Sequence, residues 1–157
     1  MKSNYTYLAF QKDINTLLKK IEVSKRKFDY ILALSRGGLV PGVVLSHKLK
    51  IPLIPQMWST RDYKSLNVHT TWIPDQIKEG KKFLVVDDIY DSGETILSLF
   101  SNWSSFVERG LGINKVIDHT AVAVLLYNSD TQYPVEFFGT AFSRRKFKKF
   151  INFFWEI

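Results

Sequence analysis

Apolar runs separated by short polar turns recur along the chain. Residues 28–34, 83–86 and 121–126 form short, almost continuous apolar segments bounded by turn residues, which is typical of strands buried on both faces of a sheet. Residues 7–23 and 96–103 place their apolar side chains at helical spacing instead, so they predict amphipathic helices. Further elements are expected as a helix over 40–49 and as strands over 51–58 and 135–138.

Strand, glycine turn and helix follow one another repeatedly. This order predicts an α/β domain with a mostly parallel central sheet flanked by helices. The 157 residues, 45% of them hydrophobic, suit one compact domain covering residues 1–157. Ligands of such sheets bind at the carboxyl ends of the strands, where residues 35–38 and 87–88 are expected. The polar segment 59–79 lacks periodicity and predicts a long loop.

Composition and charge narrow the possible functions. The absence of cysteine excludes disulfides, thiolate metal sites and a cysteine nucleophile. No signal peptide and no membrane-spanning run is visible, so we expect a cytoplasmic protein that does not bind membranes. The net charge of +7 suits either a phosphorylated small molecule or nucleic acid, and a solvated basic surface would explain it equally well.

The segment 84–96 combines several features of a sugar-phosphate site. A buried strand brings two adjacent acids to the sheet edge, and a small, hydroxylated, glycine-containing loop then enters a helix. Amides of such a loop can surround phosphate oxygens, and the acids can accept from ribose hydroxyls or hold Mg²⁺. Each feature alone is typical of a turn or a helix cap, but their coincidence predicts a binding site. The residues concerned are Asp87, Asp88, Asp91, Ser92, Gly93, Glu94 and Thr95.

The same segment resembles the PRPP-binding motif of type I phosphoribosyltransferases. Residues 34–42 resemble the diphosphate loop of the bacterial xanthine–guanine and hypoxanthine members of that family. The resemblance implies the type I fold, with a core over about 25–128 and a small C-terminal hood from about 129–157. It also implies 5-phosphoribosyl-1-diphosphate (PRPP) and a nucleobase as ligands, Mg²⁺ held by Asp87 and Asp88, and a homo-oligomer, either dimer or tetramer.

The family pattern also implies roles for individual residues. Asp91 would lie next to N7 of a purine, as general base or as the group that orients the base. Phe150 would stack on the base and Ile151 would meet its edge, although a core role explains both residues as well. Purine members carry a lysine where this chain has Asn128, which can donate a hydrogen bond but carries no charge. The diphosphate would be bound by Ser35, Arg36, Gly37 and Gly38, together with Arg61 if that arginine is more than a solvated loop residue.

These features predict an enzyme that transfers the 5-phosphoribosyl group of PRPP to a nucleobase, a purine, and releases diphosphate. The alternative is a PRPP-binding regulator of the same fold that binds nucleic acid. Its surface would be Arg144, Arg145, Lys146, Lys148 and Lys149, which a solvated helix face explains more simply. We therefore do not expect nucleic acid as a partner. Transfer to an acceptor other than a purine is a third possibility.

Overall fold

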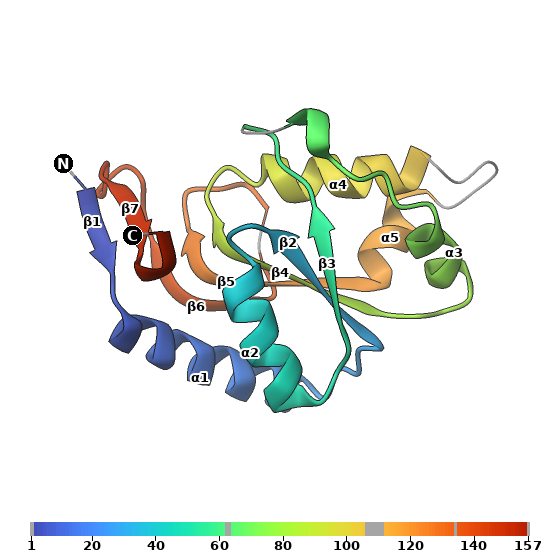
Figure 1. Cartoon of the computed structure of the whole chain (residues 1–157), viewed down its shortest axis with the longest axis horizontal. Helices are drawn as coiled ribbons and strands as arrows, with labels where there is room; N and C mark the ends of the chain where they lie inside the picture. Colours follow the sequence, from blue (N-terminus) through green and yellow to red (C-terminus); the bar gives the residue numbers. More distant parts are fainter. Residues whose placement is uncertain (1, 62–63, 106–111, 134, 157) are drawn as a thin grey trace.

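A computed structural model describes residues 2–61, 64–105, 112–133 and 135–156. Its central sheet is built from β2 (Tyr30–Ser35), β3 (Leu53–Met57), β4 (Phe83–Tyr90), β5 (Thr120–Asn128) and β6 (Phe137–Phe142). The strands lie in the order β3-β2-β4-β5-β6 and every neighbouring pair is parallel (Figure 1). The predicted α/β fold with a mostly parallel sheet is therefore confirmed.

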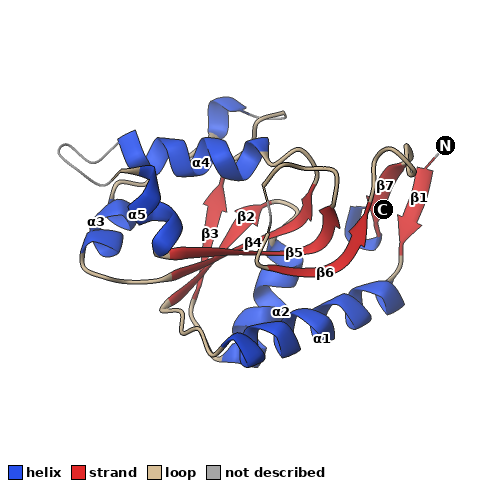
Figure 2. Cartoon of the chain, turned by 180° about the vertical axis from the view of Figure 1, so that it is seen from behind, coloured by secondary structure: helices blue, strands red, loops and turns tan. Residues whose placement is uncertain are grey.

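Helices cover both faces of this sheet. The helices are α1 (Tyr7–Ser24), α2 (Leu39–Leu49), α3 (Trp72–Lys78), α4 (Glu94–Ser105) and α5 (Ile113–Asp118). Figure 2 shows α1 and α2 on one face, and α3, α4 and α5 on the other. Because side chains alternate along a strand, Leu84 of β4 packs into the core between the sheet and α1 and α2, and Val85 packs into the core between the sheet and α3, α4 and α5. Within the described part of the chain, no helix has the length and apolarity to cross a membrane.

A second, two-stranded sheet joins two distant parts of the chain. Strand β1 (Lys2–Tyr5) pairs in parallel with β7 (Phe150–Phe153), and the 3₁₀ helix η2 (Phe154–Glu156) follows β7. The Tyr5 hydroxyl donates to Asp13 Oδ2 of α1 at 2.6 Å, and Thr140 Oγ1 of β6 donates to Asp13 Oδ1 at 2.7 Å. These bonds to a buried carboxylate tie the small sheet to the main one.

Several sequence expectations need correction. The segment 59–79 is not one loop, because it contains the 3₁₀ helix η1 (Lys64–Leu66) and α3. The last strand of the main sheet begins at Phe137 rather than Val135, although Val135 is buried. Residues 144–146 form a turn and not a helix face. Neither β1 nor α5 was expected, since both are too short to show a periodic pattern.

Candidate functional site

The acid pair lies inside β4 and not after it. β4 pairs with β2 only as far as Val86, but it pairs with β5 as far as Tyr90. The expectation that the strand stops at Asp87 was therefore wrong, because the ladder with β5 carries it further. Asp87 and Asp88 consequently lie where β2 has already ended, and their strand is open on that side.

The connection from β4 to α4 keeps its amides available. Among the described residues, the one hydrogen bond from an amide of residues 91–95 is a long contact of 3.4 Å from Glu94 N to Ser92 Oγ. Gly93 has a φ of 84°, and a side chain there would overlap the Tyr90 phenol, so the turn requires glycine. Ser92 and Glu94 are exposed. The start of α4 can therefore surround an anion with N–H groups.

The connection from β2 to α2 passes in close contact with β4. The Ser35–Arg36 peptide bond is cis. A side chain at Gly37 would overlap the Asp88 carboxylate, and one at Gly38 would overlap the Val86 carbonyl oxygen. Glycine at both positions lets this loop lie directly against the acid pair.

One predicted contact of this loop is corrected by the structure. The amide of Gly38 donates to the Leu34 carbonyl oxygen at 2.8 Å, so it is already used within the turn and does not offer its N–H to diphosphate. Ser35, Arg36 and Gly37 instead line a cavity of about 360 Å³ that reaches both acids. The loop thus borders the cavity that holds both acids, with Gly38 allowing the close approach of the backbone.

The two carboxyl groups of the acid pair are poorly hydrated. Burial raises the pKa of Asp87 well above its usual range, and repulsion from Asp88 adds to this. Burial also raises the pKa of Asp88 to about 6, against the opposing hydrogen bond from the Ile89 amide, and the charge of Glu156 raises it further. Asp88 N donates to Asp87 Oδ1 at 2.9 Å. A cation placed here would relieve both the desolvation and the repulsion.

The donor set fits magnesium better than a fully protein-bound metal. The described residues hold no group of three or more acids and histidines close enough to enclose an ion. Mg²⁺ is commonly bound by one or two carboxylates, with phosphates and waters completing its shell. Asp87 and Asp88 provide that kind of partial site.

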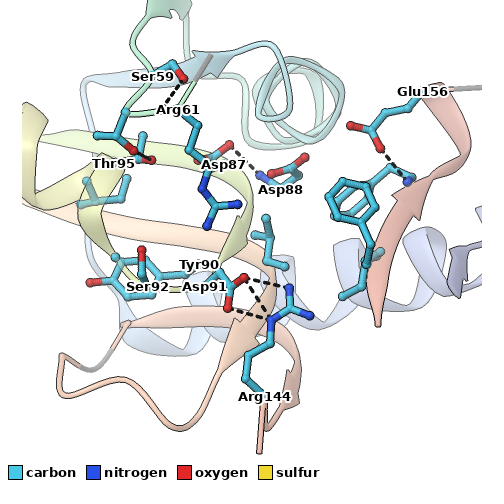
Figure 3. Close-up of a pocket in the computed structure, with 17 residues that line it drawn as sticks. Ser59, Arg61, Asp87, Asp88, Tyr90, Asp91, Ser92, Thr95, Arg144 and Glu156 are labelled. Atoms are coloured by element: carbon cyan, nitrogen blue, oxygen red, sulfur yellow. Dashed lines mark hydrogen bonds and ion pairs between the residues drawn. The ribbon is translucent and has the colours of Figure 1, made fainter. Parts of the chain in front are cut away.

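A cavity of about 250 Å³ connects the acid pair with the C-terminal strand (Figure 3). The Arg61 side chain points into it, and Thr60 Oγ1 lies 3.2 Å from Thr95 Oγ1, which ties the arginine's loop to the start of α4. This cavity and the one beside Arg36 share Asp87 and Asp88. The residues that line the cavity of about 250 Å³ are Ser59, Thr60, Arg61, Asp87, Asp88, Ile89, Tyr90, Asp91, Ser92, Gly93, Thr95, Ile96, Arg144, Phe150, Ile151, Phe153 and Glu156.

Asp91 is held by an arginine from the connection between β6 and β7. Arg144 Nε lies 2.9 Å and 3.0 Å from the two oxygens of the Asp91 carboxylate, and Arg144 Nη2 lies 2.8 Å from Oδ2 (Figure 3). This forked geometry is the strongest form of a carboxylate–guanidinium pair. The expected basic surface therefore loses one member, because Arg144 turns inward to the cavity.

Asn128 does not line the cavity, which corrects its predicted role as a base contact. Its side chain is buried, and its Nδ2 donates to the carbonyl oxygen of Asp91 at 3.1 Å and to Asp91 Oδ1 at 3.3 Å. Its Oδ1 accepts from the amides of Asp130 and Arg144 at 3.1 Å and 3.3 Å. With both ends of the amide engaged, Asn128 supports Asp91 from behind. Phe150 and Ile151 do line the cavity, and Phe150 is 61% exposed.

Two charged lining residues were missed as site residues from the sequence. Arg144 was grouped with surface charges, and no role was given to Glu156. Glu156 lines both cavities and accepts from the Phe153 amide at 3.0 Å. The position of Glu156 directly after Phe153, Phe154 and Trp155 could have indicated a site residue. No residue next to Arg144 in the sequence indicates its partner.

Comparison with known proteins relates this site to a family. The family model for the phosphoribosyl transferase domain matches residues 3–101. The xanthine-guanine phosphoribosyltransferase of Idiomarina loihiensis is 32% identical over 82 residues, which make up 50% of this chain and 51% of that protein. The chain thus spans about half the length of the curated relatives that it matches.

Solved structures cover the chain more fully. The purine phosphoribosyltransferase of Pyrococcus horikoshii superposes with a TM-score of 0.67 at 24% identity, over 99% of this chain and 94% of that one. The xanthine-guanine-hypoxanthine phosphoribosyltransferase of Helicobacter pylori gives a TM-score of 0.71 at 22% identity, over 100% and 95%. At these identities the likeness establishes the fold.

Proposed function

Because the chain belongs to the phosphoribosyl transferase domain family, we propose that it transfers the 5-phosphoribosyl group of PRPP to a purine base. In this reaction the bond from C1 of the ribose to the diphosphate breaks. A ring nitrogen of the base forms the new bond to C1 and loses its proton, and diphosphate leaves.

The observation that carries this proposal is the pairing of available amides with an adjacent acid pair. The amides of residues 91–95 make no short hydrogen bond within the described chain, and Asp87 and Asp88 lie beside them on one cavity wall. Amides bind the 5-phosphate, Ser92 and Thr95 add hydroxyl donors, and the acids accept from the ribose hydroxyls.

The diphosphate half of the site lies beside the β2–α2 loop. Ser35, Arg36 and Gly37 border it, and Arg61 brings a second guanidinium from the facing loop. Charged donors at this end stabilise the leaving group. Asp87 and Asp88 would hold Mg²⁺, which when bound neutralises charge on the diphosphate.

The base half lies under the C-terminal strand. Phe150 offers an exposed ring for stacking and Ile151 borders the same space. Stacking of aromatic rings contributes about 1 kcal/mol beyond buried area. The Asp91 carboxylate lines the same cavity as Phe150, where it can accept the hydrogen of a base nitrogen.

The test is a panel of free bases incubated with PRPP and Mg²⁺ and scored for diphosphate release. We expect release with at least one purine and none without a base. If PRPP binds but no base in the panel causes release, the chain is not a transferase.

Asp91→Asn tests the role given to Asp91. Loss of a group that handles the base proton lowers the turnover number by about 10²- to 10⁴-fold, while PRPP affinity stays close to that of the wild type. Asp118→Asn is the matched control, because Asp118 is exposed at the end of α5 and does not line the cavity. Equal turnover in the Asp91 variant would remove Asp91 from the mechanism.

Three further features belong to the proposal by family resemblance. They are a cytoplasmic location, a homo-oligomer that is a dimer or tetramer, and a core-plus-hood division of residues 1–157. β1 pairs with β7 and β6 pairs with β5, so in this division the hood would consist of β1 and the residues after β6, and not of all residues after about 129.

A further inference from the structure

We propose that Arg144 reads the base, and that the Asp91–Arg144 pair selects heterocycles that present a carbonyl oxygen beside a ring N–H. This inference rests on the transfer reaction proposed above. It names the residue that decides which base is accepted.

Arg144 is fixed in place on several sides. Besides its bonds to Asp91, its Nη1 donates to the Lys149 carbonyl oxygen at 2.7 Å. The guanidinium carbon lies 5.0 Å from the centre of the Phe142 ring. A guanidinium held this way loses little further freedom when a ligand binds.

These contacts leave donors for a ligand. Nη1 and Nη2 of an arginine each carry a pair of hydrogens. Within the described chain, Nη1 contacts one acceptor atom, on Lys149, and Nη2 contacts one, on Asp91. One hydrogen on each terminal nitrogen is therefore available, and Arg144 and Asp91 both line the cavity that Phe150 borders.

The wall next to Phe150 thus offers N–H donors from Arg144 beside a carboxylate acceptor from Asp91. A free base whose ring edge carries a carbonyl oxygen next to an N–H complements both groups, and the nucleotide product, which has lost that hydrogen, still offers its carbonyl oxygen to Arg144. An exocyclic amino group in place of the carbonyl oxygen would point a hydrogen at the guanidinium instead. Leaving such donors unmatched costs more than a matched bond gains, so the wall discriminates oxo from amino heterocycles.

Folding stability does not explain the pair. The side chains of Arg144 and Asp91 keep 29% and 23% of their surface exposed, and ion pairs with this much solvent contribute little to folding. The buried amide of Asn128 nevertheless holds both partners, through Nδ2 to Asp91 and through Oδ1 to the Arg144 amide. This support fixes the position of two charged groups at a cavity wall.

The test measures dissociation constants by calorimetry, without requiring turnover. The probes are ribose 5-phosphate, inosine 5′-monophosphate and adenosine 5′-monophosphate, which share one phosphoribosyl group and differ in the base. Wild type, Arg144→Gln, Arg144→Lys and the control Arg145→Gln are compared. Arg145 is the neighbouring arginine, with an exposed side chain outside the cavity.

We expect the wild type to bind the inosine nucleotide more tightly than the adenosine nucleotide. Arg144→Gln should weaken the inosine nucleotide by roughly 10- to 100-fold, the range for a lost hydrogen bond to a charged group, and leave ribose 5-phosphate within about twofold. Arg144→Lys should recover part of the loss, because it restores charge but not the fork. Arg145→Gln should match the wild type.

Three other results of this experiment would each contradict one part of the proposal. An unchanged ratio of inosine to adenosine affinity in Arg144→Gln removes Arg144 from base selection. An equal loss for ribose 5-phosphate shows that Arg144 supports the whole site and does not read the base. Failure of the wild type to bind ribose 5-phosphate rejects the proposed transfer reaction, and this inference with it.

Discussion

Asp87 and Asp88 carry carboxyl groups that burial keeps from full hydration, and the charge of Asp88 adds to the electrostatic cost of ionising Asp87. Two adjacent acids of this kind destabilise a ligand-free domain at neutral pH, because the folded chain holds charges that water would solvate better. They are suited to a cation and to ribose hydroxyls. The pair therefore trades stability of the empty protein for affinity.

Asp88→Asn tests this trade through pH. The folded-state pKa of Asp88 is raised to about 6, above the ordinary carboxyl pKa of about 4. Below about pH 4 Asp88 is protonated in the folded and in the unfolded chain. As the pH rises from about 4 through about 6, the cost of ionising Asp88 in the folded chain lowers the free energy of unfolding. Asparagine avoids the charge. We expect Asp88→Asn to raise the free energy of unfolding of the ligand-free protein by about 1–3 kcal/mol well above pH 6, and not below pH 4.

The same variant should lose Mg²⁺-dependent PRPP affinity. Urea unfolding at several pH values measures the first effect and calorimetry the second. A variant that is less stable than the wild type at neutral pH would show that Asp88 is stabilised by a partner, contrary to the pKa that burial gives it.

At the scale of elements, the sequence predicts those elements whose pattern of residues is contiguous along the chain. Strand β4, the loop after it and helix α4 are contiguous in the sequence, so apolar run, acids, glycine and helical spacing were all readable together. Helix α3 was missed because its buried face consists of Ile73, Pro74 and Ile77, a single turn that contains a proline. Only packing against the domain makes that turn helical.

Two glycines form a matched pair of variants, Gly93 in the β4–α4 connection and Gly80 in the α3–β4 connection. Gly93 and Gly80 have φ of 84° and 89°, but a side chain at Gly93 would overlap the Tyr90 phenol, whereas at Gly80 nothing lies within 4 Å. Gly80→Ala should cost roughly 1 kcal/mol of unfolding free energy, from backbone strain alone. Gly93→Ala should cost more than this, because the strain is joined by overlap with Tyr90.

Calorimetry with ribose 5-phosphate separates the two variants further. We expect Gly93→Ala to lose affinity because the amides of residues 91–95 shift, and Gly80→Ala to keep it. Equal costs and equal affinities in both variants would show that the loop adapts to a side chain.

At the scale of the whole molecule, the unpredicted contacts are those that join distant segments. Arg144 and Asp91 lie 53 positions apart, and a basic residue in a polar turn carries no sign of its partner. The pairing of β1 with β7 is more distant still, with Tyr5 opposite Phe153. Periodicity gives the type of an element, but such pairings are decided by three-dimensional packing.

Tyr5→Phe tests how the small sheet is anchored. The Tyr5 hydroxyl donates to buried Asp13, and burial together with this carboxylate raises the pKa of Tyr5 far above its usual range. Removing the hydroxyl leaves Asp13 with one partner fewer, which should lower the free energy of unfolding by about 1–3 kcal/mol. Tyr7→Phe is the control, since Tyr7 is 57% exposed and should change stability by less than about 0.5 kcal/mol. Similar urea midpoints for the two variants would contradict the anchoring role.

The pairing of β1 with β7 has a consequence for biosynthesis. β1 is synthesised before β2 to β6 and cannot pair until β7 has followed them, so the ring of Phe150 can reach its place only after all the strands of the main sheet have emerged. The β4–α4 connection belongs to consecutive elements and can form earlier, whereas joining residues so far apart in sequence carries a larger loop-closure entropy. A nascent chain stalled before β7 would therefore hold a sugar phosphate without a wall against which to choose a base.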